Sequence, residues 1–307
     1  MEKKIFSIIV TFNPDLFSFN EVLMLHLKTN TDGLIIIDNG SGNKEQLLEI
    51  ITKYKEFSIQ IETFFLDENK GIAFAQNLGI NKAKNELCTH VLLFDQDSFV
   101  PEDFVDNLMI QEEALTAKGY KVGAIGPVYI DSVTNSYYPQ ILVKYIFVNK
   151  VWPDKIYDEN IQVSFIIASG SLIKIETLEK VGLMNEGFFI DCVDIEWCFR
   201  ASNMGYLIFA SKSVIISHTI GDNRKISLGR EISIHSPIRR YYGVRNNILM
   251  TRMKWVPIGY RIRIFLGMLF KTPIHLYDVG FNLDHVKHTG KAFWDGFLNN
   301  NGKIKGL

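Results

Sequence analysis

The chain has 307 residues, of which 47% are hydrophobic and 22% are charged, so its composition is that of an ordinary globular protein and excludes an intrinsically disordered one. The cysteines, Cys88, Cys192 and Cys198, are odd in number and lack C-x-x-C spacing, so neither a disulfide framework nor a zinc site is indicated. No run reaches the roughly 20 apolar residues of a membrane-spanning helix, and Asn13-Pro14 follows the first apolar run where a signal peptide needs small residues for cleavage.

The net charge of −1 conceals an uneven distribution along the chain. Residues 232–277 hold eight Lys or Arg and no Asp or Glu, interleaved with large apolar side chains. Because such a segment suits an anionic surface, we expect a basic helical extension that holds a cytoplasmic protein peripherally at the inner face of the cell membrane. A homodimer through the same residues is the competing interpretation. Nucleic acid is not an expected partner, since only one segment is basic.

Short apolar runs in the first third of the chain have the composition of buried parallel strands. They span residues 5–10, 34–37, 59–65 and 91–94, and helical spacing occupies 15–28, 44–53 and 72–84 between them. This alternation predicts an α/β fold with a mostly parallel, Rossmann-like sheet flanked by helices, whose ligands lie at the carboxyl ends of the strands.

The rest of the chain gives weaker patterns. Strands are expected over residues 122–129, 163–172 and 207–216 as a mixed extension of the same sheet. Ser236-Pro237 predicts a helix start, because serine caps helices and proline suits their first turn. A helical hairpin should follow, and residues 299–307 are expected to fray.

Polar residues follow the second and third expected strands. Asp38 ends the second strand within Asp-Asn-Gly-Ser, where its carboxylate could accept from a nucleobase or ribose; a simple turn is the alternative. Asn69 and Gly71, with Asn77 further on, open a helix whose first N–H groups could face an anion. A solvated loop explains the same residues.

The sharpest motif is Leu-Leu-Phe-Asp-Gln-Asp, in which an apolar strand ends in Asp95 and Asp97. In extended chain, residues two apart point to the same side, so the two carboxylates can act together. Two hard oxygen ligands beside a diphosphate are how proteins hold Mg²⁺ or Mn²⁺. A purely structural role for the pair is less favoured.

A second acidic group, Asp191, Asp194 and Glu196, stands among aromatic and apolar residues. Acids in such surroundings have perturbed pKa values and are candidates for a general base, although acids also favour the first turn of a helix for its dipole. His218 ends the last expected strand, and we consider it both as a structural residue and as a metal ligand.

Taken in this order, the motifs resemble those of family-2 glycosyltransferases with the GT-A fold, over residues 5–250. The segments that match are 10–13, 38–41, 69–77, 95–97 and the acids before Trp197. Residues 188–197, His218 and residues 240–246 are most similar to the bacterial rhamnosyltransferases that build O-antigen and other surface polysaccharides.

The resemblance implies a GT-A domain over residues 1–230, with a nucleotide-binding half (1–121) and an acceptor and catalytic half (122–230), before a basic helical extension over 231–307. The expected donor-binding residues are Thr11, Asn13, Asp38, Asn69, Gly71, Asn77, Asp95, Arg240 and Arg245, with the arginines toward the diphosphate. The resemblance implies a metal site formed by Asp97 and Asp95, with His218 as a further candidate ligand. Asp194 aligns with the usual base. Since the family usually has Glu-Asp where this chain has Val193-Asp194, Asp191 and Glu196 stay as alternatives.

The implied reaction is an inverting transfer of L-rhamnose from dTDP-L-rhamnose to a hydroxyl of a glycan or polyprenyl-linked acceptor, with Mg²⁺ or Mn²⁺ as cofactor. One alternative is a phosphotransferase or phosphatase of the haloacid-dehalogenase type, in which Asp95 would be the nucleophile. Against it, the motif lies on about the fourth strand and no convincing later Asp-Asp pair follows. The other is a non-catalytic sugar-nucleotide-binding protein, against which the intact Asp95, Asp97 and Asp194 argue.

Overall fold

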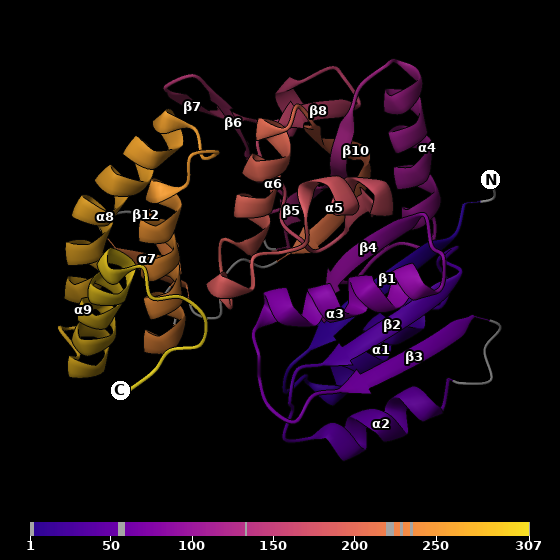
Figure 1. Ribbon diagram of the computed structural model, residues 1–307, viewed down its shortest axis with the longest axis horizontal. Coiled ribbons are helices and arrows are strands. Elements are labelled where there is room, and N and C mark those ends of the chain that lie inside the picture. The colour runs from indigo at the N-terminus through magenta and orange to yellow at the C-terminus, as the bar shows by residue number, and fades with distance from the viewer. Residues whose placement is uncertain are drawn as a thin grey trace.

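The computed structural model describes residues 3–54, 59–132, 134–218, 224–227, 230–233 and 236–306, with only the backbone for residues 218, 224–227 and 230–233. Within them the centre is an eight-stranded sheet in the order β3-β2-β1-β4-β9-β5-β10-β8 (Figure 1). These strands are β1 (Ile5–Thr11), β2 (Gly33–Asp38), β3 (Gln60–Phe65), β4 (His90–Asp95), β5 (Val122–Asp131), β8 (Asn160–Val163), β9 (Ser171–Lys174) and β10 (Leu207–His218). Two hairpins, β6 (Gln140–Lys144) with β7 (Phe147–Val151) and β11 (Arg224–Ser227) with β12 (Arg230–Ser233), lie outside it.

The first four strands pair in parallel, and β9 then enters antiparallel between β4 and β5. β10 pairs parallel to β5, whereas β8 is antiparallel to β10. The parallel half therefore gathers the carboxyl ends of β1, β2 and β4 at one edge, where ligands of open α/β sheets bind. The mixed half confirms the expected extension of the sheet.

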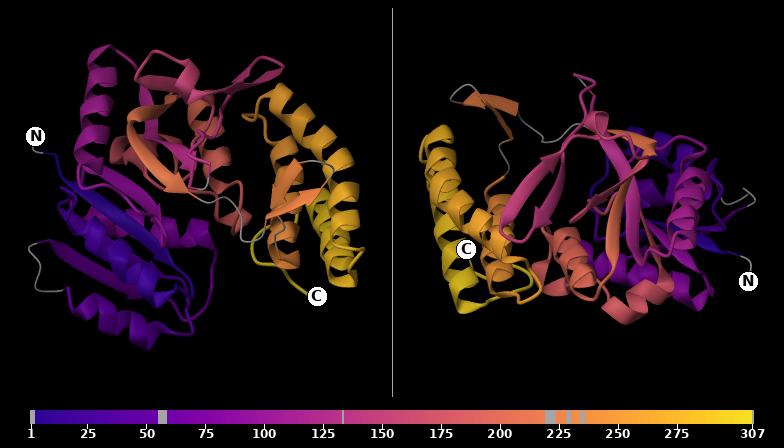
Figure 2. Two further views of the ribbon diagram at one scale, coloured as in Figure 1. Left: turned by 180° about the vertical axis from the view of Figure 1, so that it is seen from behind. Right: turned by 90° about the horizontal axis from the view of Figure 1, so that it is seen from above.

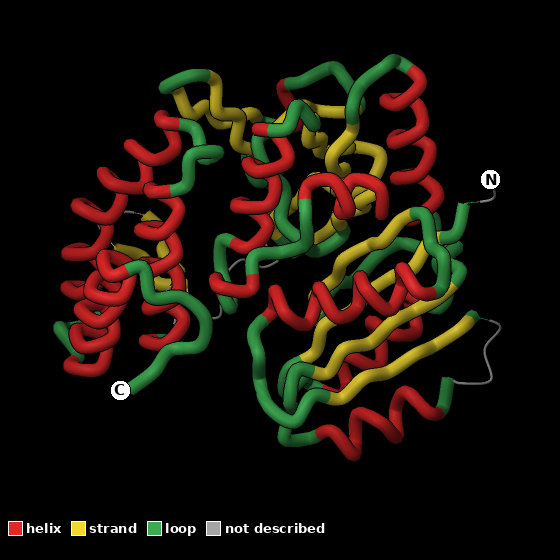
Figure 3. Tube along the Cα trace, in the orientation of Figure 1, coloured by secondary structure: helices red, strands yellow, loops and turns green. Residues whose placement is uncertain are grey.

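Helices cover both faces of the sheet (Figure 3). The helices are α1 (Leu16–His26), α2 (Lys44–Thr52), α3 (Ile72–Asn85), α4 (Phe104–Ala117), α5 (Ile175–Val181) and α6 (Val193–Asn203), with short 3₁₀ turns η1 (Pro153–Lys155) and η2 (Glu186–Phe188). Alternate residues of β1 belong to the two cores: Phe6 and Ile8 pack with α3, α5 and α6, and Ile5 and Ile9 pack with α1, α2 and α4. This alternation is why the strands are apolar throughout.

Three further helices stand together beside α6, at the opposite end of the molecule from the parallel strands (Figures 1 and 2). They are α7 (Pro237–Arg252), α8 (Ile258–Asp278) and α9 (Leu283–Leu298). Ser236 caps α7 by accepting a hydrogen bond from Arg239 N, as its sequence indicates. Among the described residues, no helix combines the length and hydropathy needed to cross a bilayer.

The structure corrects three expectations from the sequence. The strand expected over 163–172 is two strands, β8 and β9, separated by a loop, because β9 pairs with β4 and β8 with β10. The expected helical hairpin is a group of three helices. The chain after α9 is held and not frayed, since Gly302 N donates to Gly187 O at 2.7 Å and Ile304 N to Tyr242 Oη at 3.0 Å. The domain boundary at residue 230 stays a prediction.

Candidate active site

The carboxyl ends of β1 and β2 are joined by a buried carboxylate. Asp38 lies opposite Thr11 in the sheet, and both side chains are fully buried. Asp38 accepts hydrogen bonds from Thr11 Oγ1 at 3.0 Å and from the backbone N and the hydroxyl of Ser41. The expected contact of Asp38 and Thr11 with a nucleotide stays a prediction; their direct contacts hold the β1 and β2 ends together.

Side-chain amides extend this linkage along the edge. Asn13 Oδ1 accepts from Gly42 N at 2.8 Å, while Asn13 N donates to Ser41 Oγ at 2.7 Å. Gln96, between Asp95 at the end of β4 and Asp97, accepts from Phe12 N at 2.7 Å. The ends of β1, β2 and β4 are thereby held in one framework.

Asn69, Gly71 and Asn77 organise the start of α3. Asn69 Oδ1 accepts from Gly71 N at 2.9 Å and from Asn39 Nδ2 at 3.1 Å. Asn77 is buried in α3, where its amide bonds to the backbone of Met184 and to Glu186. Asn77 therefore ties α3 to the segment before α6, which is a structural task; donor contacts of Asn69 and Gly71 stay predictions.

The centre of the site is a group of acids from two elements. Asp95 ends β4, Asp97 follows it at the surface, and Asp194 lies in the first turn of α6. Their charges act on one another: burial, followed by the charges of Asp97 and Asp194, raises the pKa of Asp95 to about 7. The sequence separates these acids by nearly 100 residues, and the fold brings them together.

Asp194 is held by the backbone on both sides. Its Oδ2 accepts from Ala168 N at 3.2 Å, and its Oδ1 accepts from Ile195 N at 2.8 Å. Burial raises the pKa of Asp194 to about 6, although these hydrogen bonds lower it and nearby Asp191 raises it. A carboxylate with this pKa is a stronger base than an ordinary aspartate and is still deprotonated at neutral pH.

Three residues at the acids were not singled out in the sequence. Tyr129, on β5, donates to Ser169 O, and burial raises its pKa, with further contributions from Asp95 and Asp194. Ser98 accepts from Asp95 N at 3.2 Å and contacts Ser169 Oγ. Arg239, half-exposed at the start of α7, lies 3.6 Å from Asp191 Oδ1 and lowers the pKa of Asp95 by its charge.

The loop between η2 and α6 is strained. Phe189, Asp191 and Cys192 have φ values of 64°, 65° and 62°, and none is glycine. Non-glycine residues in this region cost about 1–2 kcal/mol each, so the surroundings must hold the loop. Gly71 lies against it: Ile72 N donates to Phe189 O at 2.7 Å, and a Cβ on Gly71 would lie 2.6 Å from that oxygen.

The structure does not bring every expected residue to the acids. Glu196 is fully buried and accepts from Arg200 Nε and Trp255 Nε1, both at 2.9 Å, so its carboxylate is engaged as a structural group and we do not retain it as a candidate base. Arg240 donates to Thr272 Oγ1 on α8 at 3.3 Å. Arg245, 1% exposed, donates to backbone carbonyls including Phe188 O at 3.0 Å.

The two arginines therefore do not face the acids, and Arg239 is the cation of α7 that does. The reason is the helical register: a Cβ added at Gly243, one turn after Arg239, would lie 3.7 Å from Asp191 Oδ2, so this face of α7 is turned to the acids. The side chain of His218 lies outside the described residues, and its expected role as a metal ligand stays a prediction.

A divalent cation fits the chemistry of Asp95 and Asp97 but needs further ligands. In the part of the chain that the structure describes, no three His, Cys, Asp or Glu side chains are arranged as a metal site. The repulsion that raises the pKa of Asp95 is what a bound cation would relieve. Two carboxylates with open positions would leave the remaining ligand positions of such a cation to a diphosphate and water.

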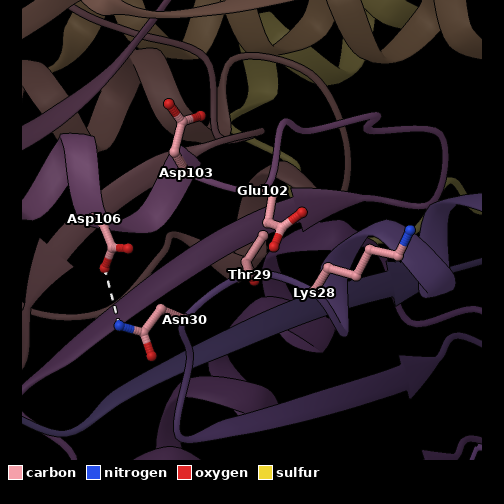
Figure 4. A pocket seen from close by; sticks show the side chains of 6 residues that line it. All are labelled: Lys28, Thr29, Asn30, Glu102, Asp103 and Asp106. Carbon is pink, nitrogen blue, oxygen red and sulfur yellow. Dashed lines mark hydrogen bonds between the residues drawn. The ribbon is translucent and has the colours of Figure 1, made fainter.

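A hollow in the described surface lies elsewhere. It has a volume of about 550 Å³ and is lined by Lys28, Thr29, Asn30, Glu102, Asp103 and Asp106, beside the start of α4 (Figure 4). Asn30 Nδ2 donates to Asp106 Oδ1 across it at 3.1 Å. It shares no residue with the acids at the end of β4, and its acidic lining does not suit a diphosphate.

The sheet order, the acids after β4 and the acid at the start of α6 define a nucleotide-sugar-dependent glycosyltransferase of the GT-A fold. The model of glycosyl transferase family 2 matches residues 18–182. The chain is also 33% identical, over 96% of both chains, to the dTDP-rhamnosyl transferase RfbF of Shigella flexneri. The protein belongs to glycosyl transferase family 2, which confirms the resemblance seen in the sequence.

Solved structures show the same fold at low identity. GalNAc-T7 with UDP, GalNAc and Mn²⁺ has a TM-score of 0.59 and 17% identity; the match covers 80% of this chain and 47% of that one. Staphylococcus aureus TarS with UDP-GlcNAc has a TM-score of 0.57 and 14% identity; the match covers 95% of this chain and 80% of TarS. The mannosyltransferase PcManGT of Pyrobaculum calidifontis, with GDP-Man and Mn²⁺, has a TM-score of 0.57 and 12% identity. This match covers 100% of this chain and 77% of PcManGT.

These comparisons do not favour the phosphotransferase alternative. In the described sheet the Asp95 motif ends the fourth strand of the chain, as the sequence indicated, within a family of glycosyltransferases. Asp95 is therefore not assigned as a nucleophile.

The contact between Gly71 and Phe189 gives a prediction. Gly71→Ala should lower turnover at least about tenfold, because its Cβ displaces Phe189 and the acid-bearing loop. Gly182→Ala is the control: Gly182 has nearly the same backbone angles (φ 91°, ψ 164°, against 93° and 157°), but the nearest atom to its added Cβ is Arg200 Nη1 at 3.0 Å and not the loop before α6. Both variants should lose about 1–3 kcal/mol of stability in urea unfolding. Equal turnover of the two would contradict this account of the loop.

Proposed function

We propose that this enzyme transfers L-rhamnose from dTDP-L-rhamnose, with inversion, to a hydroxyl of a glycan or polyprenyl-linked acceptor in bacterial surface polysaccharide synthesis. The observation that carries the proposal is the meeting of Asp95, Asp97 and Asp194 at the carboxyl end of β4. The donor is supported by the relative named dTDP-rhamnosyl transferase, which matches over nearly the whole of both chains.

Asp194 is the proposed general base. The acceptor hydroxyl must lose its proton as it attacks the anomeric carbon, and a base with pKa about 6 matches that task near neutral pH. The N–H groups of Ala168 and Ile195 hold its two oxygens, so the carboxylate has a fixed orientation. Asp191 lies nearby as the alternative base, but its interaction with Arg239 lowers its availability.

Asp95 and Asp97 are the proposed protein ligands of Mg²⁺ or Mn²⁺. When bound there, the cation would neutralise the diphosphate that leaves with the nucleotide. Arg239 is placed to add a second positive charge, since it already acts on Asp95 and Asp191. Burial of Asp95 strengthens these interactions, because charges attract more strongly in a medium of low dielectric constant. Attack and departure then occur in one displacement, with no covalent enzyme intermediate.

The proposed membrane contact is formed by one face of α8. Figure 1 shows α8 at the outer edge of the molecule, farther from the sheet than α7. Its exposed apolar side chains include Ile258, Ile262, Phe265, Leu266, Leu269 and Phe270, and Arg263 and Lys271 are exposed on the same helix. Apolar side chains beside cations suit the anionic cytoplasmic leaflet, where polyprenyl-linked acceptors reside. A homodimer through this face is the competing outcome.

The donor is tested by thermal-shift measurements and turnover with a panel of nucleotide sugars. A donor at about 100 times its Kd should stabilise the protein by about 2.7 kcal/mol, and we expect dTDP-L-rhamnose to do so with Mg²⁺ or Mn²⁺ present. Binding and turnover of a UDP-hexose alone would refute this donor without affecting the family.

Asp97→Asn should abolish metal-dependent turnover while leaving the fold intact, because Asp97 is exposed and its amide replacement is a poor ligand for a hard cation. EDTA should have the same effect on the unaltered enzyme. Asp103→Asn is a control at another exposed acid. Full activity of Asp97→Asn, or of the unaltered enzyme in EDTA, would show that Asp97 holds no essential metal.

Asp194→Asn should lower kcat by about 10²- to 10⁴-fold with little change in donor binding, because the amide cannot accept a proton. In the unaltered enzyme kcat should fall as the pH drops below about 6, since the raised pKa means that protonation removes the base there. An active Asp194→Asn variant together with an inactive Asp191→Asn variant would transfer the role to Asp191.

Flotation with anionic vesicles tests the membrane contact. Binding should weaken with added salt and drop when Arg263 and Lys271 become Gln, or when Phe265 and Phe270 become Ser. The control is the double variant Lys53→Gln with Lys118→Gln, because both lysines are exposed and lie at the C-terminal ends of α2 and α4. We avoid Arg252 and Arg261, whose side chains donate to backbone carbonyls. Unaltered protein that does not float but forms a stable dimer would contradict membrane contact.

A further inference from the structure

The strained loop that precedes α6 is held mainly by two neighbouring residues of α7. Asn246 is completely buried, and its Nδ2 lies 2.9 Å from Phe188 O, 2.7 Å from Ile190 O and 2.9 Å from Asp191 O. One amide group thus contacts three carbonyls of a segment in which Phe189 and Asp191 have positive φ. The contact spans more than 50 residues of sequence, so it is made only in the folded protein.

Arg245 supports this amide from behind. Asn246 Oδ1 accepts from Arg245 Nε at 3.0 Å and from Arg245 Nη2 at 2.8 Å, which fixes the amide with its N–H groups toward the loop. Arg245 Nη2 also reaches Gly187 O at 3.2 Å and Phe188 O at 3.0 Å. The guanidinium is 4.9 Å from the ring of Tyr242, which itself stacks on Phe189.

The same arginine connects the loop to the end of the chain. Arg245 Nη1 donates to Gly302 O at 2.5 Å, and Gly302 N donates to Gly187 O at 2.7 Å. A buried cation that donates to carbonyls on two segments costs much to remove, because each carbonyl then loses a charged donor. The loop is therefore enclosed by α7, by the start of α3 and by the residues after α9.

We propose that Arg245 and Asn246 are positioning residues for the transfer reaction, which act by fixing the backbone that presents Asp194. This proposal rests on the proposed function, since it assigns Asp194 as the base. The direct chain is short: Asn246 holds Ile190 O and Asp191 O, Cys192 O accepts from Glu196 N in the first turn of α6, and Asp194 lies in that turn. Neither residue contacts the framework of β1, β2 and β4 in the described hydrogen bonds.

The test is a double-mutant cycle between Asn246 and Asp194. Asn246→Ala should lower kcat at least about tenfold, with the Kd of dTDP in the presence of Mn²⁺ changed less than about twofold. Asn247→Ala is the matched control, since Asn247 stands next in the same helix and its side chain, within the described hydrogen bonds, donates to Gly243 O of its own helix at 2.7 Å. Its kcat should equal that of the unaltered enzyme.

If Asn246 acts through the base, its replacement should have little further effect once the base is gone. The double variant Asp194→Asn with Asn246→Ala should then have the kcat of Asp194→Asn alone, whereas a general weakening of the fold would multiply the two losses. If Asn246→Ala does not fold, Asn246→Ser and Arg245→Lys replace it in the test. Thermal unfolding and dTDP binding then show whether these variants are folded. Multiplying losses, or unchanged kcat in a folded Asn246 variant, would overturn the proposal. An unaltered enzyme that turns over no nucleotide sugar would instead refute the proposed function.

Discussion

The repulsion among carboxylates at the end of β4 is the interaction on which the site depends. Asp95 is desolvated and faces the charges of Asp97 and Asp194, so its pKa rises to about 7. Arg239 opposes this effect from α7. Such a group of acids is unfavourable for the folded protein by itself, and a cation together with the diphosphate it binds would reverse the sign of the interaction. On this account, binding of the cation and the diphosphate would relieve a repulsion that the folded protein otherwise bears.

The rest of the fold maintains this arrangement against its own repulsion. β4 is held between β1 and β9, so Asp95 cannot withdraw along the sheet. The loop before β9 supplies Ala168 N to Asp194, and the α7 pair Arg245 and Asn246 holds the strained segment before α6. The helices after residue 236 thus have a share in the site, although the acids lie on the sheet and on α6.

The parts predictable from sequence are those determined by local periodicity. The strands ending at Thr11, Asp38 and Asp95 follow from apolar runs and their polar ends. The extended geometry expected for Asp95 and Asp97 stops at Asp95, because residues 96 and 97 form a turn; that the two acids act together stays a prediction. The prediction of one strand over 163–172 was wrong. β9 inserts antiparallel beside β4, and this pairing with a distant strand leaves no periodic signal in the sequence of β9. The division of β8 from β9 is a tertiary effect.

The site residues divide in the same way. Sequence reasoning singled out Arg240 and Arg245 but not Arg239, because charge alone does not say which side of a helix faces a site. Gly243 was an available signal, since glycine inside a helix often marks a close approach, and it lies one turn after Arg239. The engagement of Glu196 by Arg200 follows a spacing of four residues in a helix and could also have been anticipated.

Calorimetric titration of dTDP into the unaltered protein, with Mn²⁺ and then with EDTA, tests the central claim most directly. If the acids at the end of β4 repel a diphosphate until a cation lies between them, dTDP should bind at least about tenfold more tightly with Mn²⁺. The difference should disappear in Asp97→Asn, in which the bridging cation is lost. Equal binding of dTDP with Mn²⁺ and with EDTA would contradict the account, because the diphosphate would then be held without neutralising the carboxylates.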